Sequence, residues 1–243
     1  LCSGPRLGAV ENFRSLVLRA DPGCAFYAFC DQDDIWHPDK LARALAWLDN
    51  HPDGPALFCG RTRTITDTGQ VIGLSPLFAR PPSIRNALVQ SLAGGNTMVM
   101  NRPAFQLLRE SLQQGTPVLH DWWTYIIVAA AGGDVHYDPR PLVDYRQHAG
   151  NLIGANDRLS DRLHRLRQAL RGRFSDWTRQ HLDLLQACAP MLTPEAQRLR
   201  SQLQALRAAR FPRRLRILAE SGLYRQTRAG QASLVLACAL GKL

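Results

Sequence analysis

Along the first 150 positions, the pattern of apolar and polar residues predicts short strands separated by helices. Short apolar runs with the length and composition of buried strands lie at 25–30, 55–60 and 97–100. The segment 37–50 places Leu41, Leu45 and Leu48 on one helical face, with Pro38 near its first turn. Strands and helices in this order predict an α/β domain with a mainly parallel sheet.

The following segments continue this alternation up to about position 148. In the run RTRTITDTGQVIG, residue types alternate on either side of the turn residues Asp67–Gly69, which predicts a hairpin at the margin of the sheet. Helices are expected over 83–92, from Pro103 onward and over 121–131, and the last of these is apolar nearly all round and hence buried. The segment 132–148 predicts one or two further short strands.

Residues 151–243 differ from the rest in pattern and in charge. Leucines at helical spacing alternate with many arginines, and breaks at Pro190, Pro194 and Pro212 predict three or four helices. This part holds 17 Lys and Arg against 6 Asp and Glu, whereas residues 1–150 hold 13 against 14. The shift predicts a boundary near Asn151, between an α/β domain at 1–150 and a basic helical region at 151–243.

Composition narrows the class of protein. The 243 residues are 45% hydrophobic, which is enough for a substantial core. Six scattered cysteines without a C-x-x-C pair indicate neither a zinc site nor a disulfide framework, so a cytoplasmic location is expected. No run approaches the about 18 apolar residues of a membrane span. The basic region could face anionic lipid, nucleic acid or an acidic partner, or it could be a solvated surface.

An acidic cluster in FCDQDDIWHPDK is the first candidate for chemistry. Asp31, Asp33 and Asp34 directly follow an apolar strand, and the ends of strands are where α/β sheets hold ligands. Hard divalent cations such as Mg²⁺ and Mn²⁺ prefer carboxylate oxygens. The D-x-D spacing puts Asp31 and Asp33 on one side of an extended segment, with Asp34 free to cap a helix or bind a loop amide. A solvated capping cluster is the alternative.

Three later segments carry further candidates. Asp121, in LHDWW, precedes a buried helix and is either a proton acceptor or a helix cap. Arg146 and His148 alternate in DYRQHAGN, an arrangement that suits a diphosphate and its metal, although a lone histidine is more often structural. Gly94 and Gly95 allow close approach of a ligand to the backbone or serve a tight turn.

Several common enzyme classes are not indicated. The chain has no G-x-G-x-x-G or G-x-x-x-x-G-K motif, so there is no support for a dinucleotide or P-loop site. It also lacks the G-x-S-x-G elbow, the H-E-x-x-H zinc motif and the kinase signatures.

The order of the motifs carries a family resemblance over about residues 8–155. NFRSLVLRA, YAFCDQDDIWHPDKL, GGNTMVMNR, HDWW and YRQHAGNLIG follow one another as in the family 2 glycosyltransferases. The chain resembles most closely the bacterial rhamnosyltransferase-like members that build cell-surface polysaccharide. The resemblance implies the GT-A fold, a Rossmann-like domain with a mainly parallel sheet, followed here by the basic helical tail.

The resemblance also implies a role for each candidate residue. Asp121 matches the catalytic base. The residues that match donor-binding positions are Asp31, Asp33, Gly95, Asn96 and Arg146. A metal, Mg²⁺ or Mn²⁺, is implied at Asp33, Asp31 and His148, with Asp33 as the main ligand.

The implied reaction is transfer, with inversion, of a sugar such as rhamnose from a nucleotide-diphosphate sugar. The implied acceptor is a lipid-linked saccharide or a polysaccharide, and the basic tail is expected to contact the inner face of an anionic membrane.

One departure from the family pattern limits this interpretation. Nothing in the chain matches the TYN-like and DDGS-like segments that grip the nucleotide base in family members. The domain is therefore expected to be truncated at its N-terminal end, with open sheet edges. An inactive fragment or a non-catalytic binding remnant is the alternative function. Nucleic-acid binding is disfavoured, because Trp177 is the only tryptophan in the basic region.

Overall fold

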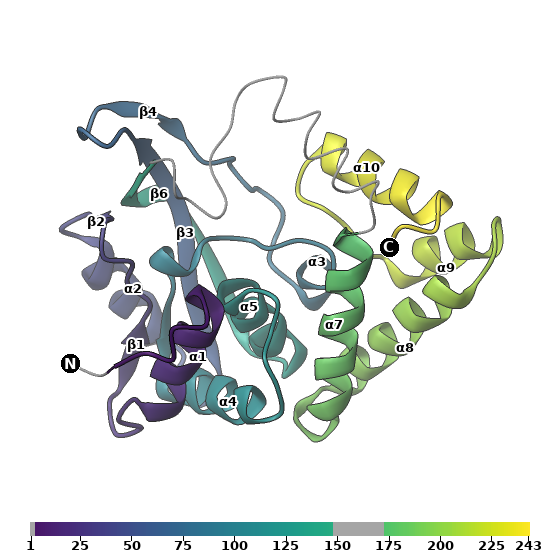
Figure 1. The fold of residues 1–243 in the computed structure, drawn as a ribbon, viewed down its shortest axis with the longest axis horizontal. Helices are drawn as coiled ribbons and strands as arrows, with labels where there is room; N and C mark the ends of the chain where they lie inside the picture. Colours follow the sequence, from purple (N-terminus) through teal and green to yellow (C-terminus); the bar gives the residue numbers. More distant parts are fainter. Residues whose placement is uncertain (1–2, 148–172) are drawn as a thin grey trace.

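The computed structural model describes residues 3–147 and 173–243. A sheet flanked by helices forms one half of the molecule, and the C-terminal helices form the other (Figure 1). The elements of the first half are α1 (Ala9–Arg19), β1 (Phe26–Ala28), β2 (Ile35–Trp36), α2 (Lys40–Leu48), β3 (Ala56–Ile65), β4 (Val71–Leu74), α3 (Ile84–Ala87), the 3₁₀ turn η1 (Gly95–Thr97), β5 (Val99–Asn101), α4 (Arg102–Gln113), α5 (His120–Ala130) and β6 (Asp134–Arg146). The second half comprises α7 (Arg173–Ala187), η2 (Ala189–Met191), α8 (Pro194–Ala208), α9 (Arg213–Ser221) and α10 (Arg228–Ala239).

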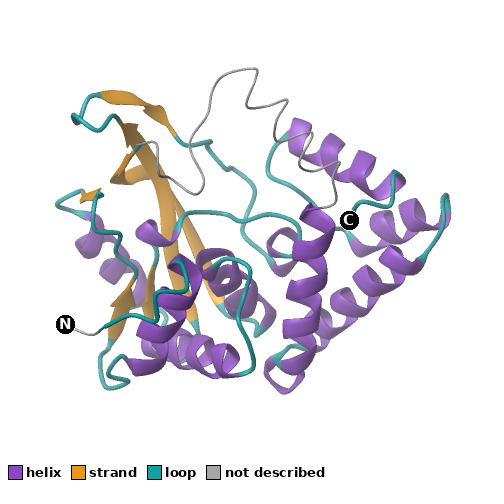
Figure 2. Cartoon of the chain, viewed as in Figure 1, coloured by secondary structure: helices purple, strands orange, loops and turns teal. Residues whose placement is uncertain are grey.

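The sheet is mixed, and most of its strand pairs are antiparallel. Its order is β1-β5-β3-β6-β2, with β4 paired to β3 outside this path. Among the strand pairs of the described residues, β3–β6 is the one parallel pair, whereas β1–β5, β2–β6, β3–β4 and β3–β5 are antiparallel. The α/β class is confirmed, and the architecture is compatible with a Rossmann-like domain (Figure 2). The expectation of a mainly parallel sheet is wrong, because alternation of strands and helices leaves strand direction open. After β4 the chain passes through a long loop and the short α3 to β5, and β5 runs antiparallel to β3.

Local patterns predicted several elements well. The hairpin around Asp67–Gly69 is formed by β3 and β4, and α5 is buried on nearly every side. Asn101 caps α4, with proline in its first turn. The helix expected over 83–92 is shorter, because only Ile84–Ala87 is helical. In place of the one or two short strands expected over 132–148, Asp134–Arg146 form one long strand, β6, which accommodates Pro139 and Pro141 through register shifts against β3.

The two halves share one hydrophobic core. Trp122 of α5 lies 6.1 Å from the rings of Phe174 and Trp177 and 4.7 Å from His181, all three on α7. Buried leucines of α7, α8, α9 and α10 belong to the same cluster as α4 and α5. Arg85 adds polar contacts across the halves, donating to the carbonyl of Ser221 at 2.6 Å. The boundary expected near Asn151 lies outside the described residues.

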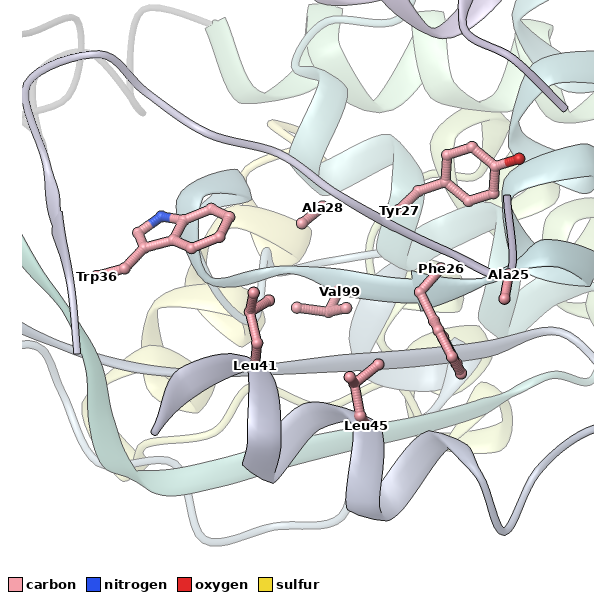
Figure 3. Close-up of a pocket in the computed structure, with 8 residues that line it drawn as sticks. All are labelled: Ala25, Phe26, Tyr27, Ala28, Trp36, Leu41, Leu45 and Val99. Atoms are coloured by element: carbon pink, nitrogen blue, oxygen red, sulfur yellow. The ribbon is translucent and has the colours of Figure 1, made fainter. Parts of the chain in front are cut away.

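β1 lies at one edge of the sheet and has an apolar hollow on each face. Among the described strands it pairs only with β5. A hollow of about 380 Å³ runs between β1 and α2, and its lining includes Phe26, Trp36, Leu41, Leu45 and Val99 (Figure 3). A second hollow of about 160 Å³ lies between β1 and α1, and its lining includes Phe13, Leu16, Tyr27 and Phe29. β1 is therefore an edge strand among the described strands.

The buried side chain of Asn101 joins three segments at the base of the sheet. Its Oδ1 accepts hydrogen bonds from the amides of Ala56 and Ala104, each at 3.0 Å. Its Nδ2 donates to the carbonyls of His51 at 2.9 Å and Gly54 at 2.7 Å. The side chain thereby ties the loop after α2 to the start of β3 and the start of α4.

We predict that Asn101→Ala lowers the free energy of unfolding by about 3 kcal/mol, because it leaves buried backbone groups without partners and removes a helix cap. Asn50→Ala is the control, because the exposed Asn50 side chain donates a single bond to the carbonyl of Ala46. Urea denaturation of both variants measures the difference. Equal stability of the two variants would contradict the role given to Asn101.

Candidate active site

Four chain segments meet where β1 ends. The loop after β1 carries Asp31, Asp33 and Asp34, and the turn η1 carries Gly95 and Asn96. The first turn of α5 adds Asp121, and the last residue of β6 is Arg146. The sheet order explains this meeting, because β1 and β5 are neighbours and β6 pairs with β2, the strand that follows the acidic loop.

Asp34 connects these segments through its carboxylate. Its Oδ1 accepts a hydrogen bond from the backbone amide of Arg146 at 3.1 Å, and its Oδ2 accepts a short one from Nδ2 of Asn96. The guanidinium of Arg146 returns to the same loop, with Nε donating to the carbonyl of Asp33 at 3.0 Å. Nη1 of Arg146 reaches the carbonyl of Asp67 at 2.5 Å, which fixes the β3–β4 hairpin to the site.

The carboxylates of the site repel one another. Burial, followed by the negative charges of Asp34, Asp33 and Asp121 in that order, raises the pKa of Asp31 to about 6. Burial and the same four carboxylates together raise the pKa of Tyr145 to about 12. Asp121 is distant from the other three in sequence, so its influence shows that the fold brings it close to them. The site has an excess of negative charge at neutral pH.

Gly95 allows η1 to approach the start of α5. A Cβ atom at Gly95 would lie 2.6 Å from Nε2 of His120 and 3.4 Å from the Cβ of Asp121, so no larger residue fits without movement. His120 is held from its other side by Phe13, whose ring stacks on the imidazole at a centroid distance of 3.9 Å. Burial lowers the pKa of His120.

Asp121 lies in the first turn of α5, two positions after the N-cap residue Leu119. Its Oδ1 accepts a bond from the amide of Trp122 at 2.6 Å. The carboxylate therefore binds the amide of the next residue, whereas the N-cap position belongs to Leu119, so the expectation that Asp121 is the helix cap is wrong. The half-buried Asp121 also lies beside Gly95 and close enough to the acidic loop to affect the pKa of Asp31.

Lys40 is a residue of the site that sequence reasoning missed. Its side chain has no exposed surface. Nζ donates to the carbonyl of Asn96 at 2.6 Å and lies 3.4 Å from the centre of the Trp36 ring. Burial lowers its pKa to about 7, while the nearby thiol of Cys30 and the carboxylates of Asp34 and Asp31 act in the opposite direction. From the sequence, Lys40 is simply the first residue of an amphipathic helix, and no local signal reveals its burial.

The residues predicted from the sequence divide into two groups. The structure brings together Asp31, Asp33, Gly95, Asn96, Asp121 and Arg146. The predicted metal ligand His148 lies outside the described residues.

The acidic loop is suited to a divalent cation that is completed by other ligands. The described residues contain no group of three or more His, Cys, Asp and Glu side chains able to hold a metal ion. Mg²⁺ usually takes only one or two carboxylates from a protein, with phosphate and water supplying the rest. Burial and the neighbouring carboxylates together raise the pKa of Asp31, and a cation at this place would relieve both the desolvation and the repulsion.

Comparison with known proteins supports a relationship to glycosyltransferases. No protein-family profile matches the chain. The chain is similar to the dTDP-rhamnosyl transferase RfbG of Shigella flexneri, with 25% identity over 168 residues, covering 61% of this chain and 52% of that protein. The match thus spans about half the length of the relative. Its acceptor and mechanism are not carried over by similarity at this level.

We predict that Asp31→Asn stabilises the protein at pH 7 in the absence of divalent cations. A carboxyl whose pKa is raised on folding opposes folding once it ionises, and this penalty grows as the pH rises from about 4 through 6. After allowance for solvent screening, the gain in the free energy of unfolding is about 1 kcal/mol at pH 7 and close to zero at pH 4.

Urea denaturation at both pH values measures this gain. Asp53→Asn, which removes an exposed carboxylate in the loop after α2, is the matched control and is expected to show no such pH dependence. A difference between Asp31→Asn and wild type that is equal at pH 4 and pH 7 would show that Asp31 does not carry the repulsion.

Proposed function

We propose that the chain is the metal-binding and catalytic part of an inverting glycosyltransferase. The observation that carries the proposal is the meeting of Asp31, Asp33, Asp121 and Arg146 at one site. Transfer from a nucleotide sugar requires carboxylates that hold a cation, an arginine that pairs with the diphosphate and a separate carboxylate that accepts a proton. The similarity to a dTDP-rhamnosyl transferase supports the same class of reaction.

Each residue has a distinct part in donor binding. Asp33 and Asp31 hold Mg²⁺ or Mn²⁺, and His148 is proposed as a further ligand. Arg146 is positioned by Asp33 and Asp34 and pairs with the diphosphate of the donor. When bound, the cation neutralises the charge that develops on the departing diphosphate. Gly95 and Asn96 form the backbone beside the donor sugar and the acceptor.

The proposed chemistry is a single displacement. Asp121 accepts the proton of the acceptor hydroxyl, and the oxygen attacks the anomeric carbon of the donor sugar. The bond between that carbon and the diphosphate oxygen breaks, and its electron pair leaves with the nucleoside diphosphate. Attack from the face opposite the leaving group inverts the anomeric configuration. Asp121 is a carboxylate before the step and a carboxylic acid after it.

The proposed donor is a rhamnosyl nucleotide, and dTDP-rhamnose is the first compound to test, because the name of the similar protein specifies it. The proposed acceptor is a lipid-linked saccharide or a growing polysaccharide of the cell surface. A cytoplasmic location is proposed because Cys24, Cys30, Cys59, Cys188 and Cys238 are all free thiols.

The edge of β1 favours a second candidate function. β1 pairs on one side only among the described strands, and apolar hollows lie on both of its faces. These hollows and the unpaired side of β1 could receive a partner strand. In this second candidate function, the chain is a non-catalytic module that binds a donor diphosphate weakly and transfers nothing.

We predict that the chain with Mn²⁺ releases dTDP from dTDP-rhamnose when a saccharide acceptor is supplied. Asp121→Asn is expected to lower the rate by about 10²–10⁴-fold, because the proton acceptor is lost. Asp33→Asn is expected to lower it to a similar degree, because the cation is lost. Asp53→Asn is the control and retains the wild-type rate. Chromatography of the released nucleotide measures all four proteins.

Donor binding, measured by saturation-transfer NMR, separates the candidate functions. Binding that requires Asp33, without release of dTDP, identifies the non-catalytic module. Neither binding nor release at any Mn²⁺ concentration would reject both functions.

A further inference from the structure

The last helix, α10, presents an apolar face that no described residue covers. Its inner face is buried through Leu234 and Cys238. On the outer face, Val235 is 42% exposed, and Leu236 and Leu240 are each 51% exposed. Ala232 lies one turn earlier and is also exposed. α10 lies at the rim of the helical half of the molecule (yellow in Figure 1).

The surroundings of this face are strongly basic. From Ala196 to the end of the chain, Glu220 is the only acidic residue, against ten Arg and Lys. Exposed basic residues in this part are Arg198, Arg210, Arg213, Arg216, Arg228 and Lys242. Arg228 begins α10 and Lys242 follows its end, so both ends of the apolar face carry positive charge.

A second apolar side chain belongs to the same region. Phe211, in the loop between α8 and α9, is 65% exposed and lies between Arg210 and Pro212 in sequence. Arg214 joins this loop to the end of α10, because its guanidinium donates to the carbonyls of Ala209 and Cys238. The contacts of Arg214 therefore keep the loop that carries Phe211 close to the end of α10.

The chemistry of this surface selects among possible partners. Single-stranded nucleic acid needs several aromatic rings for base stacking, whereas this surface offers the single ring of Phe211 beside the aliphatic side chains of α10. A second copy of the chain would bring like positive charges together around the apolar face. An anionic bilayer offers hydrocarbon for the leucines and negative head groups for the arginines.

We propose that α10 lies in the interface of an anionic lipid bilayer, parallel to the membrane. Val235, Leu236 and Leu240 insert among the acyl chains, while Arg228 and Lys242 contact lipid head groups. Among the described helices, none is both long and apolar enough to cross a bilayer, so contact is with the surface. The proposal does not depend on the glycosyltransferase chemistry, because none of these residues belongs to the site at the end of β1.

The test is flotation of the full chain with vesicles of phosphatidylcholine alone or mixed with phosphatidylglycerol. The variant Val235→Ser/Leu236→Gln removes two exposed apolar side chains from α10. The matched control is Val71→Ser/Ile72→Gln on β4, an adjacent pair that is 60% and 55% exposed. Circular dichroism checks that both variants fold.

The wild-type chain and the β4 control are expected to float with the mixed vesicles at low salt. The α10 variant is expected to bind the mixed vesicles about tenfold more weakly or worse, because membrane affinity scales with buried apolar area. Binding to phosphatidylcholine alone is expected to be weak, and salt is expected to weaken binding to the mixed vesicles.

Three results would overturn the proposal. The first is equal binding of the α10 variant and the β4 control to the mixed vesicles. The second is a wild-type dimer that the α10 variant disrupts in sedimentation velocity, which would assign the face to a second copy. The third is displacement of the chain from the vesicles by an oligonucleotide that binds wild type and the α10 variant equally.

Discussion

Repulsion among four carboxylates is the interaction around which this site is built. Asp31, Asp33 and Asp34 follow one edge strand, and Asp121 joins them from the start of a helix almost ninety positions away. The surrounding contacts hold these groups together against their charge. Asp34 is engaged by Asn96 and by the backbone of Arg146, while the buried Lys40 fastens η1 beneath the acidic loop. The proposed cation would relieve this repulsion, which connects the fold to the proposed reaction.

The C-terminal helices pack against α5, the helix that carries Asp121. α5 carries Asp121 at its first turn, and its other faces pack against α4, β3 and the first C-terminal helix, α7. The C-terminal helices are consequently part of the core that positions Asp121. The apolar face of α10, which lies among basic residues, is not part of that core and is the proposed lipid contact. The proposed donor site and the proposed membrane contact therefore lie on separate parts of one chain.

Sequence reasoning predicted the local elements and the membership of the site better than the topology. The hairpin at Asp67–Gly69 and the buried α5 follow from turn residues and periodicity, which act over a few positions. Strand direction depends on long-range pairing, so the antiparallel pairs of β5 were not predictable from the alternation of strands and helices. The burial of Lys40 depends on the ring of Trp36 and the carbonyl of Asn96, contacts that no local pattern encodes.

The central claim is that the acidic loop binds a divalent cation together with a nucleoside diphosphate. Electron paramagnetic resonance of Mn²⁺ titrated into the full chain tests it directly, because free and bound Mn²⁺ give different spectra. The account predicts one site per chain that tightens when dTDP is added and is lost in Asp33→Asn. Absence of bound Mn²⁺ with and without dTDP, or binding that Asp33→Asn leaves unchanged, would contradict it.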